Sequence, residues 1–294
     1  MHTKAIGIDL GCTNIKAVLM DAGGTVLQEW RGETHEPDDR AWKGAIQKIV
    51  REFQALAPAA PIGLSAPGLA NEANTCIAFM PGRLPGLENF NWSTHIGQRV
   101  FVVNDAHAAL MAEATFGAAK SCRHAILLTL GTGVGGGILI DGALYQGLHQ
   151  MAGHLGHATV QSTTHLADVT NMPGSLEDAI GNLTIKARSL GRFETTWDLV
   201  AAYQQGDPFA TWLWLDSVRK LAVAIASFIN ILSPELVVIG GGISRAEENL
   251  VTPLRHFLDV YEWQPGGKKT PLALAHFSDA AGAIGAAAFA LSKS

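Results

Sequence analysis

Residues 128–142 read LTLGTGVGGGILIDG, and this stretch decides the fold. Its first glycines have the G-x-G-x-x-G spacing of a dinucleotide-binding turn, which must open directly into a helix that faces the pyrophosphate. Here the apolar run ILI follows instead, and Asp141-Gly142 closes it. This pattern indicates a strand that ends in a hairpin. The glycines therefore lie between two strands, and the dinucleotide-binding interpretation fails.

A glycine turn between two strands has two interpretations. Successive backbone N–H groups around Gly131 and Gly133 can form an anion-binding nest, to which Thr132 adds a hydroxyl donor. Alternatively, the glycines only satisfy the geometry of a tight hairpin. The other half of the chain favours the first interpretation, because residues 7–21, GIDLGCTNIKAVLMD, repeat the order strand, glycine turn, strand.

In this second stretch Asp9 ends the first strand, and Gly11, Thr13 and Lys16 follow. Two such loops, one from each half, are suited to bind a polyphosphate. Lys16 is either a phosphate contact or a solvated strand residue. A third cluster, Gly240, Gly241 and Gly242, follows a strand of buried type and leaves room for a base or ribose against the backbone.

Both halves show three strands, a helix, a strand and a helix-bearing connection. The first half predicts strands at 5–10, 14–20, 25–31, 61–65 and 100–104 and helices at 39–56 and 105–116. The second predicts strands at 124–130, 136–140, 143–146, 235–239 and 272–277 and helices at 176–190, 197–203, 208–232, 246–261 and 280–291. We expect an N-terminal lobe at 1–117 and a C-terminal lobe at 118–294. The last helix, about 280–294, is a candidate for packing back on the N-terminal lobe.

Composition restricts the class of protein. The 294 residues are 48% hydrophobic and 16% charged, with a net charge of −5, so no basic surface predicts a nucleic-acid partner. Three isolated cysteines form neither a disulfide framework nor a C-x-x-C metal site. The longest apolar stretch, residues 221–232, is shorter than the roughly 20 residues that cross a bilayer. We expect a cytoplasmic protein that binds no membrane.

The ordered set of motifs resembles the ROK family of sugar kinases and sugar-responsive repressors, over essentially the whole chain. The residues that carry the resemblance are Asp9-x-Gly11-x-Thr13-x-x-Lys16, Asn104-Asp105, Gly131-Thr132-Gly133, Gly153-x-x-Gly156-His157, Leu176-Glu177, Gly240-Gly241-Gly242 and the closing Ala/Gly-rich helix. The resemblance implies an α/β protein with the actin/hexokinase-like ATPase fold, which is ribonuclease H-like. It also implies an ATP- and Mg²⁺-dependent kinase, a phosphotransferase whose acceptor is an alcohol group of a hexose.

The resemblance also assigns roles to residues. Asp105 would be the general base for the attacking hydroxyl, and an Asp with a reference pKa of about 3.9 is ionised at pH 7. Asn104 would bind an adjacent hydroxyl. As residues alone, Asn104-Asp105 is also an ordinary start of a helix. Asp9 would lie near Mg²⁺, through water, and the loops at Thr13 and Thr132 would face the phosphates.

The chain departs from the family at three places. The loop after His157 lacks the cysteines that bind structural zinc in many members, so we expect no zinc; His165 and Asp168 are poor substitutes, and His157 is then available to the sugar together with Glu177. His154 stands where most members have Glu. It either donates to the carbonyl of an N-acetylated sugar or is a polar residue at the rim of the site. Arg83 either selects an anionic sugar or points into solvent.

The sequence thus predicts a sugar kinase for a glucose-like hexose. The alternatives are an N-acetylmannosamine or other N-acetylhexosamine kinase and a catalytically silent sugar sensor of the same fold. A pure ATPase switch is a third class. The chain begins at its first strand, so we expect no DNA-binding domain. The nearly all-apolar helix at 212–232 predicts a buried element or a subunit interface, and we expect a homodimer.

Overall fold

The computed structural model describes residues 3–35, 39–80, 82–162 and 170–294. Contacts divide the chain into two compact units. Unit 1 comprises Met1–Ser121, Ala143–Ala152 and His276–Ser294, and unit 2 comprises Cys122–Gly142 and Gly153–Ala275. The final segment of the chain therefore returns to the unit that contains the first strand.

Unit 1 is built on a sheet with the strand order β3-β2-β1-β4-β7. The first three strands are antiparallel, whereas β4 and β7 run parallel to β1. The elements of this unit are β1 (Lys4–Leu10), β2 (Asn14–Asp21), β3 (Val26–Glu33), α1 (Asp39–Leu56), β4 (Ile62–Ala66), β5 (Leu69–Ala70), β6 (Ile77–Phe79), α2 (Trp92–Ile96), β7 (Val100–Asn104), α3 (Asp105–Phe116), β10 (Ala143–Leu144), the 3-10 turn η1 (Leu148–Gln150) and α9 (Ala281–Ser292).

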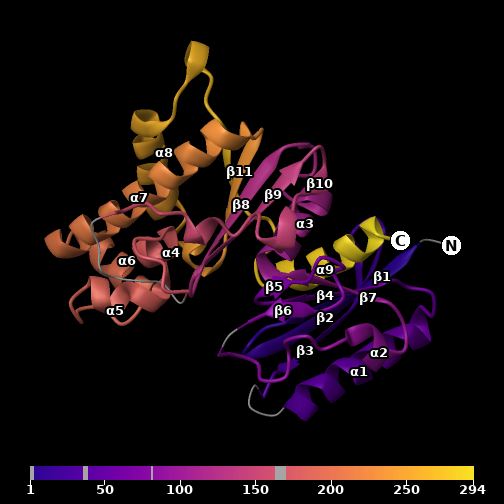
Figure 1. The fold of residues 1–294 in the computed structure, drawn as a ribbon. Helices are drawn as coiled ribbons and strands as arrows, with labels where there is room; N and C mark the ends of the chain where they lie inside the picture. Colours follow the sequence, from indigo (N-terminus) through magenta and orange to yellow (C-terminus); the bar gives the residue numbers. More distant parts are fainter. Residues whose placement is uncertain (1–2, 36–38, 81, 163–169) are drawn as a thin grey trace. The chain divides into compact units, whose positions relative to one another are not determined.

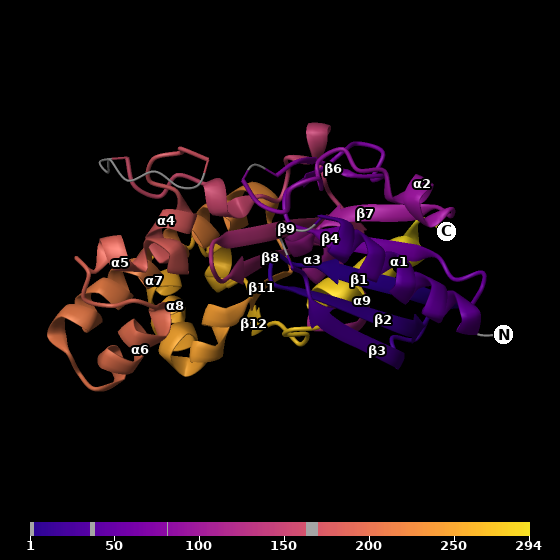
Figure 2. The ribbon, with the colours of Figure 1, turned by 90° about the horizontal axis from the view of Figure 1, so that it is seen from below.

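The two faces of this sheet pack against different helices because side chains alternate along each strand. Ile6 and Ile8 of β1 lie in the hydrophobic core that contains the apolar face of α1. Gly7, between them, faces α9 instead, where a Cβ would lie 2.8 Å from the backbone nitrogen of Ala287. Its register partner Gly63 on β4 meets the backbone of the same helix. Glycine at these positions lets α9 lie directly on the sheet, and Figures 1 and 2 show the yellow helix against the indigo strands.

Unit 2 contains a second sheet with the order β9-β8-β11-β12, in which β8, β11 and β12 are parallel and β9 is antiparallel to β8. The helix α7 packs its buried face against residues of β8 and β11, and α8 packs beside α7. The elements of this unit are β8 (Ala125–Leu130), β9 (Val134–Ile140), η2 (Leu155–His157), α4 (Leu176–Ile180), η3 (Asn182–Thr184), α5 (Ile185–Arg188), α6 (Thr196–Gln204), α7 (Pro208–Leu232), β11 (Leu236–Gly240), η4 (Gly242–Ala246), α8 (Glu248–Tyr261), η5 (Pro265–Gly267) and β12 (Leu272–Leu274).

The continuous helix that the sequence predicts at 176–190 is wrong. The chain leaves helical geometry at Gly181, whose φ is −61° and ψ is 151°. The next two amides do not extend the helix: Asn182 donates to the carbonyl of Gly131 at 2.9 Å, and Leu183 donates to that of Thr132 at 3.0 Å. Contacts far along the chain thus override the local helical pattern.

Smaller differences concern short elements. The predicted strands at 143–146 and 272–277 are shorter, because β10 ends at Leu144 and β12 at Leu274. The hairpin of β5 and β6 and the short helix α2 lie where the sequence indicates only a loop rich in Pro and Gly. No helix in the described part of the chain has both the length and the apolar character to span a bilayer.

Candidate active site

Asp9 lies next to the end of β1, between strands that hold its carboxylate. The register pairs it with Lys16 on β2 and with Ser65 on β4. The hydroxyl of the buried Ser65 donates to Asp9 Oδ1 at 2.8 Å. Burial raises the pKa of Asp9 to about 6 against the opposing effect of this hydrogen bond, and the charge of Asp105 raises it further while that of Lys16 lowers it. Two carboxylates of unit 1 are therefore close enough for one to affect the ionisation of the other.

The start of α9 lies against the Asp9 carboxylate. A Cβ at Gly282 would lie 2.5 Å from Asp9 Oδ1 and 2.7 Å from Oδ2, so only glycine fits there without a shift. The first turn of a helix carries a partial positive charge, which favours an ionised neighbour. Lys16 Nζ donates to the backbone carbonyl of Asp279, just before this helix, at 2.8 Å. Lys16 thus links β2 to the chain that leads into α9.

The loop at Gly11 and Thr13 has a fixed shape. Gly11 N donates to Asn14 O at 2.9 Å and closes the turn between β1 and β2. The buried Thr34 holds the loop twice, since its hydroxyl donates to Gly11 O at 2.6 Å and its amide to Thr13 O at 2.9 Å. The side chain of Thr13 is exposed. The backbone is therefore held from below while its outer face is open to a ligand.

Asn104 and Asp105 occupy the junction of β7 and α3. Asn104 Oδ1 caps the helix by accepting from the amides of Ala106 at 2.9 Å and His107 at 3.2 Å. Its Nδ2 donates to Gly68 O at 3.0 Å. The side chain of Asp105, at the first position of the helix, is exposed, and its Oδ1 accepts from Ala106 N at 2.8 Å. The helix cap orients the residue pair, so the capping role and a catalytic role are compatible.

In unit 2 the glycine turn between β8 and β9 is closed by a hydrogen bond from Gly131 N to Gly133 O at 2.9 Å. Glu177 on α4 reaches this turn, since its Oε2 accepts from Val134 N at 2.9 Å. A Cβ at Gly133 would overlap the Glu177 carboxylate, with 2.7 Å to its Cδ. Glycine at this position is thus required by Glu177. We name residues 131–134 the phosphate loop.

The second carboxylate oxygen of Glu177 is buried and accepts no hydrogen bond from any described residue. The side chain itself is only 8% exposed. A buried carboxylate oxygen without a donor costs free energy, about 1–3 kcal/mol or more for a charged group. A hydroxyl group of a ligand would supply the missing donor.

His154 and His157 flank the 3-10 turn η2, which lies on β9. Their rings are nearly parallel, with an interplanar angle of 18° and centroids 6.4 Å apart. Glycines allow this turn to lie close to the strand: a Cβ at Gly156 would meet the backbone of Val134, and one at Gly136 would lie 2.7 Å from Gly153 O. Both imidazoles thereby belong to the same unit as the phosphate loop.

The third glycine cluster follows β11. Gly241 has a φ of +83°, and a Cβ there would lie 2.6 Å from the backbone nitrogen of Leu130. Since Leu130 ends β8 and immediately precedes the phosphate loop, Gly240, Gly241 and Gly242 lie at the same sheet edge as that loop. In parallel sheets this carboxyl edge is where ligands bind.

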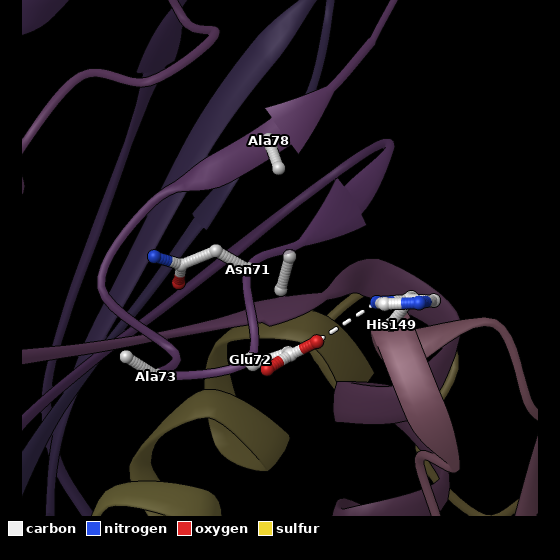
Figure 3. A pocket seen from close by; sticks show the side chains of 6 residues that line it. Asn71, Glu72, Ala73, Ala78 and His149 are labelled. Carbon is white, nitrogen blue, oxygen red and sulfur yellow. Dashed lines mark hydrogen bonds and ion pairs between the residues drawn. The ribbon is translucent and has the colours of Figure 1, made fainter.

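A pocket of about 430 Å³ in unit 1 contains none of the predicted site residues. Figure 3 shows its lining, with Glu72 Oε1 and His149 Nδ1 facing each other at 2.8 Å. His149 and the adjacent Gln150 both have positive φ, 58° and 62°. Since Asn104 bonds to Gly68, only two residues from the pocket residue Ala70, this pocket is connected through the backbone to the junction of β7 and α3.

Two sequence expectations concern metals and charge. Within the described ranges, no group of three or more His, Cys, Asp or Glu side chains could hold a metal ion. His165 and Asp168, considered as substitutes for zinc ligands, lie outside the described residues. Arg83 is exposed.

Sequence reasoning missed several residues that shape these sites. Ser65 holds Asp9, Thr34 holds the loop after β1, and Gly282 makes room for the Asp9 carboxylate. Ser65 carried a usable signal, because it ends a predicted buried strand parallel to β1. The other two are paired with their partners only by the fold.

Comparison with known proteins agrees with this architecture. A model described as the ROK family matches residues 5–293. The glucokinase of Thermotoga maritima is 32% identical over 277 residues, which cover 86% of each chain. An N-acetylgalactosamine kinase of a Shewanella species is 26% identical and is matched over 96% of this chain and 94% of its own length. The crystal structure of a ROK hexokinase from Thermus thermophilus superimposes with a TM-score of 0.88 at 29% identity, over 99% of each chain. This chain belongs to the ROK family and has its actin/hexokinase-like α/β fold.

Proposed function

We propose that this chain is an ATP-dependent sugar kinase that transfers the γ-phosphate of ATP to a hydroxyl of a hexose. Glucokinase is the name of the relative at 32% identity. The observation that carries the proposal is the pair of carboxylates in unit 1: Asp105 is exposed at the first position of α3, and its charge raises the pKa of Asp9. Phosphoryl transfer to an alcohol needs a base for the alcohol and an anionic residue for the metal, and the pair supplies both.

Asp105 is the general base in this proposal. Its carboxylate accepts the proton of the attacking hydroxyl, and the cap made by Asn104 fixes the start of the helix that carries it. The hydrogen bond from Ala106 N to Oδ1 restricts the rotation of the carboxylate. Asn104 Nδ2 contacts Gly68 O and has a second hydrogen for an adjacent sugar hydroxyl.

Asp9 would hold Mg²⁺, through a bound water. Carboxylate oxygen is the ligand that Mg²⁺ prefers, and burial has left this carboxylate with a raised pKa, which a cation would lower. The metal ion would neutralise charge on the phosphates. Ser65 keeps one oxygen of Asp9 in place, and the start of α9 fixes the carboxylate from the other side.

The two glycine turns and the cluster after β11 would bind the nucleotide. Backbone amides at Gly11 and Thr13, and at Gly131, Thr132 and Gly133, would face the phosphates. Gly240, Gly241 and Gly242 would contact the base or ribose. Lys16 is proposed as a phosphate contact of lower weight, because its ammonium group already donates to Asp279 O.

The sugar would be bound by Asn104, His154, His157 and Glu177. Glu177 is the best supported of these, because one buried oxygen has no donor among the described residues and a sugar hydroxyl would provide it. The two imidazoles can each donate or accept according to tautomer.

A second candidate is a kinase for N-acetylated hexosamines. Two observations favour it: His154 can donate to an acetamido carbonyl, and one relative is an N-acetylgalactosamine kinase. A sugar sensor without turnover is the third candidate.

The test follows ADP release with Mg-ATP and a panel of glucose, mannose, N-acetylmannosamine and N-acetylgalactosamine. Turnover with an unmodified hexose supports the first candidate, and turnover only with the acetylated sugars supports the second. ADP release that no sugar changes indicates an ATPase switch. Sugar binding measured by calorimetry without any ADP release indicates a sensor and contradicts the kinase proposal.

Further features complete the proposal. The functional lobes are residues 1–117, with the final helix at about 280–294, and residues 118–294. We propose a cytoplasmic homodimer that binds neither nucleic acid nor membrane. The exposed apolar side chains Trp212 (61%) and Ile231 (76%) on α7 are candidates for its interface.

A further inference from the structure

The phosphate loop in unit 2 is held by one segment of the chain, residues 176–184. Glu177 accepts a hydrogen bond from Val134 N, while Asn182 N and Leu183 N donate to the carbonyls of Gly131 and Thr132. These three bonds account for both ends and the middle of the loop. The position of the loop therefore depends on the position of this segment.

The segment is short and irregular, and it has little intrinsic stability. It comprises one turn and a half of helix in α4 and a 3-10 turn in η3, joined at Gly181. Isolated helices of this length do not persist in water. Something outside the segment must hold it, and in this structure that residue is Arg188.

Arg188 donates to three different groups with three nitrogens of its guanidinium. Nη2 donates to Gly181 O at 3.1 Å, at the break of the helix. Nε donates to Thr184 Oγ1 at 2.9 Å, and Thr184 in turn donates to Asp178 O at 2.7 Å. Both bonds hold the segment at the point where its helical geometry ends.

The third nitrogen of Arg188 anchors the group to the core of unit 2. Nη1 donates to the hydroxyl of Ser217 at 2.8 Å, and Ser217 is buried on α7, the 25-residue helix that packs on the sheet. Burial lowers the pKa of Arg188 to about 10, against the charges of Asp178 and Asp216, and the guanidinium remains protonated at neutral pH. A planar group with five fixed donors is suited to bridge three acceptors, which a lysine ammonium cannot match.

We propose that Arg188 is a positioning residue for phosphoryl transfer, because it fixes the segment that holds both Glu177 and the phosphate loop. The inference rests on the proposed function, since it takes residues 131–134 as the site for the phosphates. Arg188 itself touches neither nucleotide nor sugar in this proposal. Its loss would displace two binding groups together, the loop amides and the carboxylate of Glu177.

The experiment compares Arg188→Met and Arg188→Lys with the matched control Arg219→Met. Arg219 lies on α7 in the same unit and pairs with Asp216, and its printed partners do not include the segment 176–184. Leu258→Ala, a buried residue of α8, serves as a second control that lowers stability without touching the segment. All variants are assayed at a temperature well below their unfolding midpoints, and kcat and the KM values for ATP and sugar are measured.

The expected result is a fall of about 10- to 100-fold in kcat/KM for both substrates in Arg188→Met, the range typical of small misplacements of binding groups. Arg188→Lys restores part of this loss, and both controls remain within about threefold of the wild type. If the wild type is active and Arg188→Met keeps its kinetic constants, or if Leu258→Ala lowers them equally, the inference is wrong while the proposed function stands. If the wild type neither turns over any sugar nor binds a non-hydrolysable ATP analogue, the proposed function fails, and the inference fails with it.

Discussion

The contact between Gly133 and Glu177 gives a prediction that can be worked out in free energy. A Cβ at residue 133 would lie 2.7 Å from Glu177 Cδ, closer than real Cβ contacts, and the three nearest atoms all belong to Glu177. The φ of Gly133 is not in the left-handed region, so alanine is compatible with the backbone itself. The penalty of Gly133→Ala therefore comes from one side chain.

Two contributions set the size of this penalty. Inserting a methyl group into a packed site costs about 1–3 kcal/mol. Moving the Glu177 carboxylate away would also break its bond from Val134 N, and bonds to charged groups contribute about 1.5–3 kcal/mol. The structure relaxes along the cheaper route, so we expect Gly133→Ala to lower the free energy of unfolding by about 2 kcal/mol.

A double-mutant cycle isolates this contact. In the Glu177→Ala background the space next to residue 133 is vacant, and Gly133→Ala should cost less than about 0.5 kcal/mol there. The free energy of unfolding is measured by urea denaturation followed by circular dichroism for the wild type, both single variants and the double variant. A coupling energy of about 1.5 kcal/mol or more supports the reasoning. Additive effects of the two substitutions, within about 0.5 kcal/mol, would refute it.

Three further predictions concern the rest of the molecule. Because the pKa of Asp9 is raised to about 6 on folding, its ionisation destabilises the folded state as the pH rises from 4 to 6; Asp9→Asn in EDTA should therefore match the wild-type melting temperature near pH 4 and exceed it above pH 6, and equal melting temperatures at pH 8 would contradict this. Gly63→Ala places a Cβ within the backbone of α9 and should lower the melting temperature by about 4 °C or more, whereas Gly44→Ala, on the open side of α1, should not lower it in the same thermal scan. Sedimentation velocity at micromolar concentration should show a dimer that Trp212→Ser weakens, and a monomer at all concentrations would contradict the proposed assembly.

Much of the fold could be predicted because local patterns and the final structure agree. The helix at 39–56 has strong apolar periodicity and forms α1 at the same residues. The glycine turns at Gly11 and Gly131 interrupt β-type runs, and each lies between two antiparallel strands. Where the pattern was continuous but tertiary contacts were stronger, the prediction failed. Gly181 ends α4 because the amides that follow it bond to the phosphate loop.

The candidate site could be predicted only in part, for a related reason. Asp9, Asn104 and Asp105 are recognisable because they stand at strand ends in motifs of fixed spacing. Ser65 and Thr34 act on residues 56 and 23 positions away, and no local pattern marks them. The bond from Val134 N to Glu177 spans 43 positions, so the link between the phosphate loop and α4 required the three-dimensional structure.

The most direct test of the account measures transfer of labelled γ-phosphate from Mg-ATP to the best sugar of the panel, in the wild type and in Asp105→Asn. The substitution keeps the size of the side chain and the oxygen that accepts from Ala106 N, but it removes the base. The account predicts that the rate falls by about 10²- to 10⁴-fold while the Kd for the sugar changes by less than about threefold. Near wild-type transfer by Asp105→Asn would contradict it.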